Sequence, residues 1–183
     1  MHSGEVGTSV RPGTLLVAPP AQAADPVFGR TVVLVLDREP SGITSGIVIN
    51  RPLQQTVLHG SALALLFVPD PSAPMFWGGP LGQDPAVLAE FSSTDGLEWF
   101  HLPLRQRRPF VLPEVGVIAV AEHTGPFEGR IRRARAFLGL CVWGRGQLEA
   151  ELERGAWWPR QATVEDLFSP EPEQLWDRLA AQG

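Results

Sequence analysis

The chain has 183 residues, enough for one domain with a sizeable core, and a formal net charge of −5. It contains no lysine, which excludes a P-loop lysine, a Schiff-base lysine and a lysine general base. Its single cysteine excludes an internal disulfide and a thiol-rich zinc site. No apolar run reaches the ~18 residues that a membrane-spanning helix needs. We therefore expect a cytoplasmic protein with no membrane segment.

Residues 1–12 are small and polar, and we expect a flexible leader ahead of a single domain over 13–183. Apolar runs rich in β-branched residues predict most of the strands. The segment 82–91 is ambiguous between helix and strand, and we favour a strand. The strands 31–37 and 46–52, joined by about eight residues, form a predicted hairpin that Pro52 ends. The remaining predicted strands are 14–18, 75–77, 115–121 and 136–143.

Helical signals are fewer than strand signals. Apolar residues at helical spacing predict a helix over 58–67 and an amphipathic C-terminal helix over 173–182. A further helix is expected over 147–157, directly after a Gly-x-Gly turn. The segment 122–134 predicts a turn followed by a short helix, and 161–172 a connector. Because strands outnumber helices and do not strictly alternate with them, the expected fold class is α+β.

Two short segments could contribute to a ligand site. Asn50 and Arg51 end a predicted strand, where a guanidinium fork could bind the carboxylate or phosphate of a small anionic ligand. The alternative is that Asn50 caps a turn and Arg51 pairs with a local acid. Gly78 and Gly79 would expose backbone amides that can bind anions, although such a pair more often simply turns the chain.

The turn around Gly144 and Gln147 joins a strand to a helix, where free amides at a helix N-terminus can bind an anion. A dinucleotide fingerprint would need a third glycine at position 149, and this chain has Glu149 there. We therefore expect no dinucleotide, and we expect no other cofactor either. Together with Trp143, Gln147 completes the predicted ligand site, and the tryptophans otherwise read as core residues.

The sequence gives little support for a reactive cysteine, a metal site or nucleic-acid binding. Cys141 lies in an apolar strand, where a cysteine is usually an inert small hydrophobe. The four histidines lack metal-ligand spacing, so no metal site is expected. Two arginine clusters could contact nucleic-acid phosphates, although the net acidic chain favours a solvated surface and argues against direct DNA binding. The candidate phosphate contacts are Arg105, Arg107, Arg108, Arg132 and Arg133.

Six segments follow one another in the chain as GTLLVAPP (13–20), DPVFGRTVVLVLD (25–37), SGIVINRPL (45–53), FWGGPLGQD (76–84), WGRGQLEAELERGAWW (143–158) and LFSPEPEQLWDRL (167–179). Together, and in this order, they resemble the AlgH/YqgE family of small bacterial proteins. The resemblance implies an α+β fold whose branched, mainly antiparallel sheet curls into a pseudo-barrel with helices packed against it. Part of the family is labelled as transcriptional regulators, but the resemblance implies no reaction, cofactor or DNA site.

One strand departs from the family pattern. Where the family commonly has Gly-Tyr-Ala-Gly-Trp, residues 139–143 of this chain read Gly-Leu-Cys-Val-Trp. We expect a non-enzymatic binding or regulatory module that recognises a small anionic ligand or a protein partner. The alternatives are a direct DNA-binding regulator, and an enzyme with an unrecognised small-molecule site.

Overall fold

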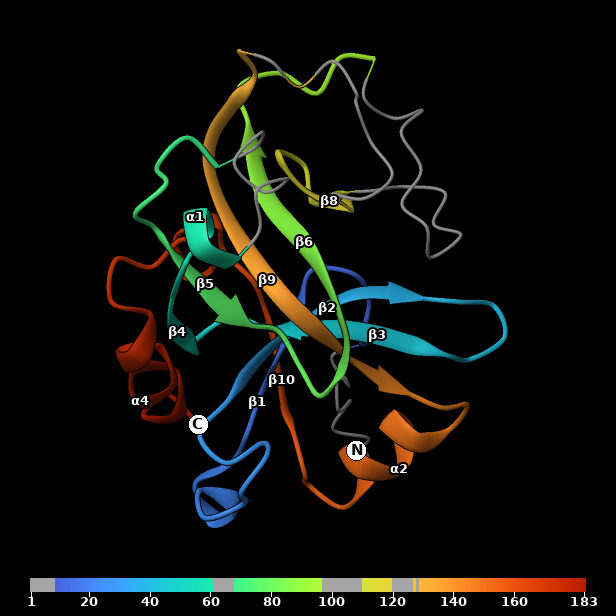
Figure 1. Cartoon of the computed structure of the whole chain (residues 1–183). Coiled ribbons are helices and arrows are strands. Elements are labelled where there is room, and N and C mark those ends of the chain that lie inside the picture. Colours follow the sequence, from blue (N-terminus) through green and yellow to red (C-terminus); the bar gives the residue numbers. More distant parts are fainter. Residues whose placement is uncertain (1–8, 61–67, 97–109, 120–126, 128) are drawn as a thin grey trace.

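The computed structural model describes residues 9–60, 68–96, 110–119, 127 and 129–183 (Figure 1). These residues form one ten-stranded sheet and several short helices. The strands are β1 (Thr14–Val17), β2 (Val32–Arg38), β3 (Thr44–Val48), β4 (Pro52–Thr56), β5 (Pro74–Trp77), β6 (Leu81–Phe91), β7 (Phe110–Leu112), β8 (Val115–Ala119), β9 (Ile131–Trp143) and β10 (Trp158–Gln161). The helices are η1 (Pro20–Gln22), α1 (Val57–Gly60), α2 (Gln147–Glu153), α3 (Val164–Leu167), η3 (Pro172–Gln174) and α4 (Leu175–Ala180).

Strand β9 organises the sheet because three different strands pair along it (Figure 1). Most of its length pairs antiparallel with β6, and residues 141–143 pair antiparallel with β3. Phe137 and Leu138, which also pair with β6, pair in parallel with β5. The main path is β10-β1-β2-β3-β9-β6-β8-β7, with β4 and β5 branching from β9. The predicted α+β fold with a branched, mainly antiparallel sheet is confirmed.

The sheet curls until β7, at one end of this path, meets the segment before β1. The amide of Gly13 donates to the Val35 carbonyl at 2.9 Å. A Cβ on Gly13 would lie well under 3.0 Å from the Val111 carbonyl oxygen of β7, so only glycine allows this approach. The resulting pseudo-barrel encloses the largest apolar cluster, which includes Leu34 and Phe137.

The helices cover the sheet at two places. Leu148 of α2 and the following Trp157 pack over Cys141 and Trp143 of β9, which forms a second apolar cluster on the outer face. At the C-terminus, Leu175, Trp176 and Leu179 are buried, as their predicted helical spacing requires. The Trp176 indole donates to the Ala18 carbonyl at 2.7 Å, which fixes α4 beside the end of β1.

Most predicted elements are confirmed within a few residues. The predicted hairpin is the antiparallel pair β2–β3, and the ambiguous segment 82–91 lies within strand β6. Of the predicted helix 58–67, α1 accounts for the first turn, and residues 61–67 lie outside the described residues. Residues 1–8 of the predicted leader also lie outside them, whereas Val10 is buried and its carbonyl accepts a hydrogen bond from Arg38 at 3.3 Å.

The predicted short helix within 122–134 is wrong over 131–134, which begin β9. The basic residues here suggest a solvated helical face. In the structure, Arg133 is the register partner of the buried Glu90 on β6, and the two side chains form an ion pair at 2.5 Å. A buried acid from a distant strand therefore makes the arginine-rich sequence compatible with β-structure.

Three other element boundaries differ from the predictions. Pro52 begins β4 instead of ending the preceding strand, because proline is tolerated as the first residue of an edge strand. The helix predicted over 147–157 ends at Glu153, and Gly155 follows with a φ of +72°. Helix α3 lies within the predicted connector 161–172. The edge strand β10 lies directly before this helix and ends at Gln161. The proline in β10 conceals this strand from a reading of the sequence.

Candidate functional site

The carboxamide of Asn50 connects two parts of the backbone. Its Oδ1 accepts from the Val32 amide at 2.9 Å, and its Nδ2 donates to the Arg30 carbonyl at 3.0 Å. The residue is buried, so these bonds satisfy polar groups that would otherwise be costly to bury. Asn50 thus fixes the entry into β2, and this use occupies both ends of its side chain.

The guanidinium of Arg51 is also engaged by the backbone. Its two terminal nitrogens donate to the carbonyls of Val27 and Gly29 at 2.6 and 2.9 Å. It lies 5.0 Å from the centre of the Trp77 ring, within the range of a cation–π contact. Burial lowers the pKa of Arg51, while the charge of Asp25 acts in the opposite direction. The guanidinium fork, one of the two candidate anion contacts at this strand end, is thus bonded to the loop before β2.

Gly78 and Gly79 allow strands β5 and β9 to approach closely. The amide of Gly78 donates to the Leu138 carbonyl at 2.7 Å, and its carbonyl accepts from the Val48 amide at 2.8 Å. A Cβ on Gly78 would lie well under 3.0 Å from the carbonyl oxygen of Gly139. The pair of glycines therefore forms the branch point of the sheet.

Trp143 and Gln147 belong to a separate cluster centred on Glu151, which the sequence reading missed. One oxygen of the Glu151 carboxylate accepts from the indoles of Trp143 and Trp157 at 2.9 and 2.8 Å. The other accepts from the Gln147 amide at 3.1 Å, and Gln147 accepts from the Gly144 amide at 3.0 Å. The sequence does contain a signal for this cluster, because two tryptophans flank an acidic helix and their buried indoles need an acceptor.

The six predicted site residues therefore form two sets. Asn50, Arg51 and the two glycines lie around the start of β2 and the end of β5, whereas Trp143 and Gln147 hold α2 against the sheet. In both sets, the polar side chains already have protein partners. The acidic first turn of α2, which contains Glu149, also disfavours an anion there.

The Cys141 thiol is buried beneath α2 and lies 3.6 Å from the Gly78 carbonyl oxygen. Burial raises its pKa to about 12, and the Arg51 charge offsets this only in part. A reactive cysteine needs the opposite shift. The structure therefore favours the inert, structural role.

We expect the Cys141 thiol of the native protein to resist alkylation by iodoacetamide at pH 8 and to react readily after denaturation. Because its folded pKa lies above its ordinary value of 9.0, the group contributes stability that is complete below about pH 9. That stability is lost as the pH rises from about 9 towards about 12. Mass spectrometry of the alkylated protein checks the predicted resistance to iodoacetamide, and rapid labelling of native protein would contradict it.

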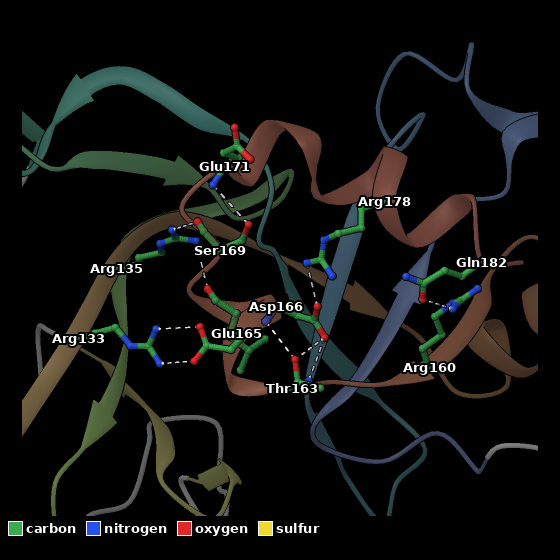
Figure 2. A network of polar contacts seen from close by, with 11 residues as sticks. Arg133, Arg135, Arg160, Thr163, Glu165, Asp166, Ser169, Glu171, Arg178 and Gln182 are labelled. Atoms are coloured by element: carbon green, nitrogen blue, oxygen red, sulfur yellow. Dashed lines mark hydrogen bonds and ion pairs between the residues drawn. The ribbon is translucent and has the colours of Figure 1, made fainter.

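The arginines predicted as phosphate contacts are only partly described. Arg105, Arg107 and Arg108 lie outside the described residues, and Arg132 is exposed. Figure 2 shows Arg133 facing Glu165, to which it donates two hydrogen bonds of 3.1 and 3.4 Å.

Further hydrogen bonds in Figure 2 attach the C-terminal segment to β9 and, through Arg160 and Gln182, to β10. Arg135 donates to the carbonyls of Leu167 and Ser169, and burial lowers its pKa to about 10. The buried Asp166 caps α3 through Thr163 and accepts from Arg178 at 3.0 Å. These arginines stabilise internal packing.

An open pocket of about 470 Å³ lies beside the branch point, and of the six predicted site residues only Gly79 lines it. Its walls come from α1, β4, β5, the start of β6, and β9, which lie together in Figure 1. We call it the Trp77 groove. The residues important to its chemistry are Leu53, Gln55, Trp77, Gly79, Gln83 and Leu138.

The Trp77 groove has no ionisable residue among the described residues that line it. The sequence reading missed it because the two glutamines lie in different strands. Within the described part of the chain, no group of three or more histidine, cysteine, aspartate or glutamate residues is placed to hold a metal ion. No helix among the described residues is long and apolar enough to cross a membrane.

The AlgH-like family model (DUF179) matches residues 15–182. A UPF0301 protein from Thermobifida fusca is 40% identical over 174 residues, covering 91% of this chain and 84% of that protein. A UPF0301 protein from Streptomyces coelicolor is 38% identical over 179 residues, with coverages of 95% and 87%.

Two solved structures are similar. The solution structure of AlgH from Pseudomonas aeruginosa has a TM-score of 0.64 and 25% identity, covering 99% of this chain and 92% of that one. The crystal structure of a protein from Corynebacterium diphtheriae has a TM-score of 0.75, covers 100% and 90% of the two chains and, at 21% identity, shows the fold alone. With the match over residues 15–182, these findings establish that the chain belongs to the AlgH-like family.

Proposed function

We propose that the protein is a non-enzymatic, cytoplasmic binding module with a regulatory role, whose ligand binds in the Trp77 groove. The observation that carries this proposal is the contrast between two sets of polar side chains. The side chains of Asn50, Arg51 and Gln147 are engaged by the protein itself, whereas the exposed Gln83 side chain at the groove bonds to none of the described residues. A pocket with a few available polar groups is the usual form of a small-molecule site.

The lining of the groove supports binding over catalysis. General acid–base catalysis needs a titratable side chain within hydrogen-bonding reach of the substrate. Covalent catalysis needs an activated nucleophile. The described lining residues offer neither, and Cys141, the one thiol of the chain, is buried with a raised pKa. A binding module with a small-molecule or protein partner fits these residues better than an enzyme does.

Direct DNA binding has less support. Arg133 is held by two acids and Arg135 by two carbonyls, so neither guanidinium is available to a phosphate. Of the described candidates, Arg132 alone is exposed without such partners. A gel shift with duplex DNA tests this alternative. Binding that weakens steeply as salt is raised would support it, because phosphate contacts release counterions.

A thermal-shift screen against a metabolite and nucleotide library tests the proposed function. A ligand present at 100 times its dissociation constant should stabilise the protein by ~2.7 kcal/mol, which is several degrees for a chain of this size. We expect at least one such hit, and we expect Trp77→Leu to abolish its shift.

The matched control for this screen is Trp158→Leu, which changes a half-buried tryptophan that does not line the groove. Each variant is compared with its own melting temperature without ligand, so that loss of stability is not mistaken for loss of binding. A hit whose shift survives Trp77→Leu would place the ligand elsewhere. A screen without hits would remove the small-molecule proposal in favour of a protein partner.

A further inference from the structure

The Trp77 groove crosses four neighbouring strands in the order β4, β5, β9 and β6. Trp77 of β5 and Leu138 of β9 are register partners and form its middle. Gln55 comes from β4 on one side, and Gln83 comes from β6 on the other. The groove therefore has an aromatic and aliphatic centre between two carboxamides.

Both carboxamides retain hydrogen-bonding capacity. Both side chains are exposed, and among the described residues Gln83 has no side-chain partner, while Gln55 makes one long hydrogen bond of 3.4 Å from its nitrogen to the His59 carbonyl. The Gln55 oxygen thus remains an acceptor without a described partner. A glutamine side chain presents a donor and an acceptor side by side, a pattern that matches the paired acceptor and donor of a planar base edge.

The charge of the surroundings disfavours an ionic ligand. No ionisable side chain is among the described residues lining the groove, and Arg51, which lies over the Trp77 ring, already donates to two carbonyls. An anion or a cation bound here would give up part of its hydration without gaining a counter-charge, which is unfavourable. The small anionic ligand expected from the sequence does not match this lining.

We infer that the groove binds an uncharged, planar heterocycle with an adjacent hydrogen-bond donor and acceptor, of the kind found on a nucleobase. The inference rests on the proposed function and specifies its ligand class. The ring would stack on Trp77 and contact Leu138, and its polar edge would bond Gln83 or Gln55. Base–aromatic stacking of this kind is independent of charge. The volume of about 470 Å³ is within the range of small-molecule sites.

An NMR titration of the ¹⁵N-labelled full chain tests the inference with adenine and uracil as probes. We expect both to shift the indole signal of Trp77 and the backbone amides of Gly79 and Gly82, which line the groove. The matched probe 1,3-dimethyluracil keeps the planar ring but lacks the N–H donor, and we expect at least tenfold weaker binding. Adenosine 5′-monophosphate adds two charges to the base and should bind more weakly than adenine.

Two variants connect the result to the groove. Gln83→Leu should weaken the binding of the tighter probe about tenfold, the effect of losing one hydrogen bond worth ~1.4 kcal/mol. Gln182→Leu, at an exposed glutamine outside the groove, should leave binding unchanged. Equal weakening by both variants would contradict a direct contact from Gln83.

The outcomes separate the inference from the proposed function. Shifts at Trp77, Gly79 and Gly82 with glucose or an anionic metabolite, but with neither base, would retain the groove as a binding site and overturn the ligand class. Equal binding of uracil and 1,3-dimethyluracil would overturn the donor–acceptor recognition. If neither base shifts these signals at millimolar concentration, the inference fails, and the library screen alone decides the proposed function.

Discussion

Gly139→Ala is expected to destabilise the protein by about 3–4 kcal/mol, a loss of roughly 10 °C in Tm for a chain of this length. Gly139 has a φ of +76°, which costs an alanine roughly 1–2 kcal/mol. In addition, its Cβ would lie well under 3.0 Å from the carbonyl oxygen of Gly79. That oxygen belongs to the backbone at the branch point, so it cannot move aside without disturbing β5 and β9.

Gly146→Ala separates the two contributions. Gly146 has a nearly identical φ of +75°, but nothing lies within 4 Å of the position that a Cβ would take there. It should therefore lose only the conformational part, about 1 kcal/mol. Chemical denaturation with a common slope measures both variants. Equal losses at the two positions would show that the close approach of Gly139 to Gly79 contributes nothing.

Glu151→Ala is expected to lower the free energy of unfolding by about 3 kcal/mol. The change removes the acceptor shared by the indoles of Trp143 and Trp157, and both tryptophans are buried. Each unsatisfied buried donor costs about 1–3 kcal/mol. Glu151→Gln, which keeps an acceptor oxygen, should recover part of the loss.

The control for this experiment is Glu153→Ala on the same helix, at an exposed position. Surface substitutions of this type usually change stability by less than about 0.5 kcal/mol. Urea unfolding monitored by tryptophan fluorescence measures all three variants. A Glu151→Ala protein as stable as Glu153→Ala would show that the carboxylate does not hold the two indoles together.

The sequence predicted the fold well where burial dictates the pattern. The run 32–36 is apolar throughout because β2 lies between β1 and β3 and is covered on both faces. A continuous apolar run of this length predicts a strand buried on both faces. The amphipathic spacing of Leu175, Trp176 and Leu179 likewise required a helix with one buried face. These signals are local, so they predict the element without any knowledge of the elements that it packs against.

The failures share a different origin, because they depend on partners distant in the chain. Arg133 reads as a helical surface residue until Glu90 is placed opposite it, 43 residues away. Strand β10 was not predicted, because its proline and polar residues are tolerated only at an edge, beside β1. No local pattern contains that information.

The geometry of the candidate site also depends on partners distant in the chain. Asn50 and Arg51 stand at a strand end, a position shared by ligand-binding residues and by side chains that hold loops. What distinguishes the two roles is the position of the Val27, Gly29 and Arg30 carbonyls, which only the fold provides. Gln55 and Gln83 are separated by 28 positions and have no motif, so their approach across the sheet left no signal in the sequence.

The most direct test of the account is a crystal structure of the protein with the compound that gives the largest thermal shift. We expect the ligand over Trp77, with a hydrogen bond to Gln83 or Gln55, and with Asn50 and Arg51 still bonded to the backbone carbonyls. A ligand held instead by the Arg51 guanidinium, or seated beside Trp143 and Gln147, would contradict the account. It would show that the residues singled out by the sequence form the binding site after all.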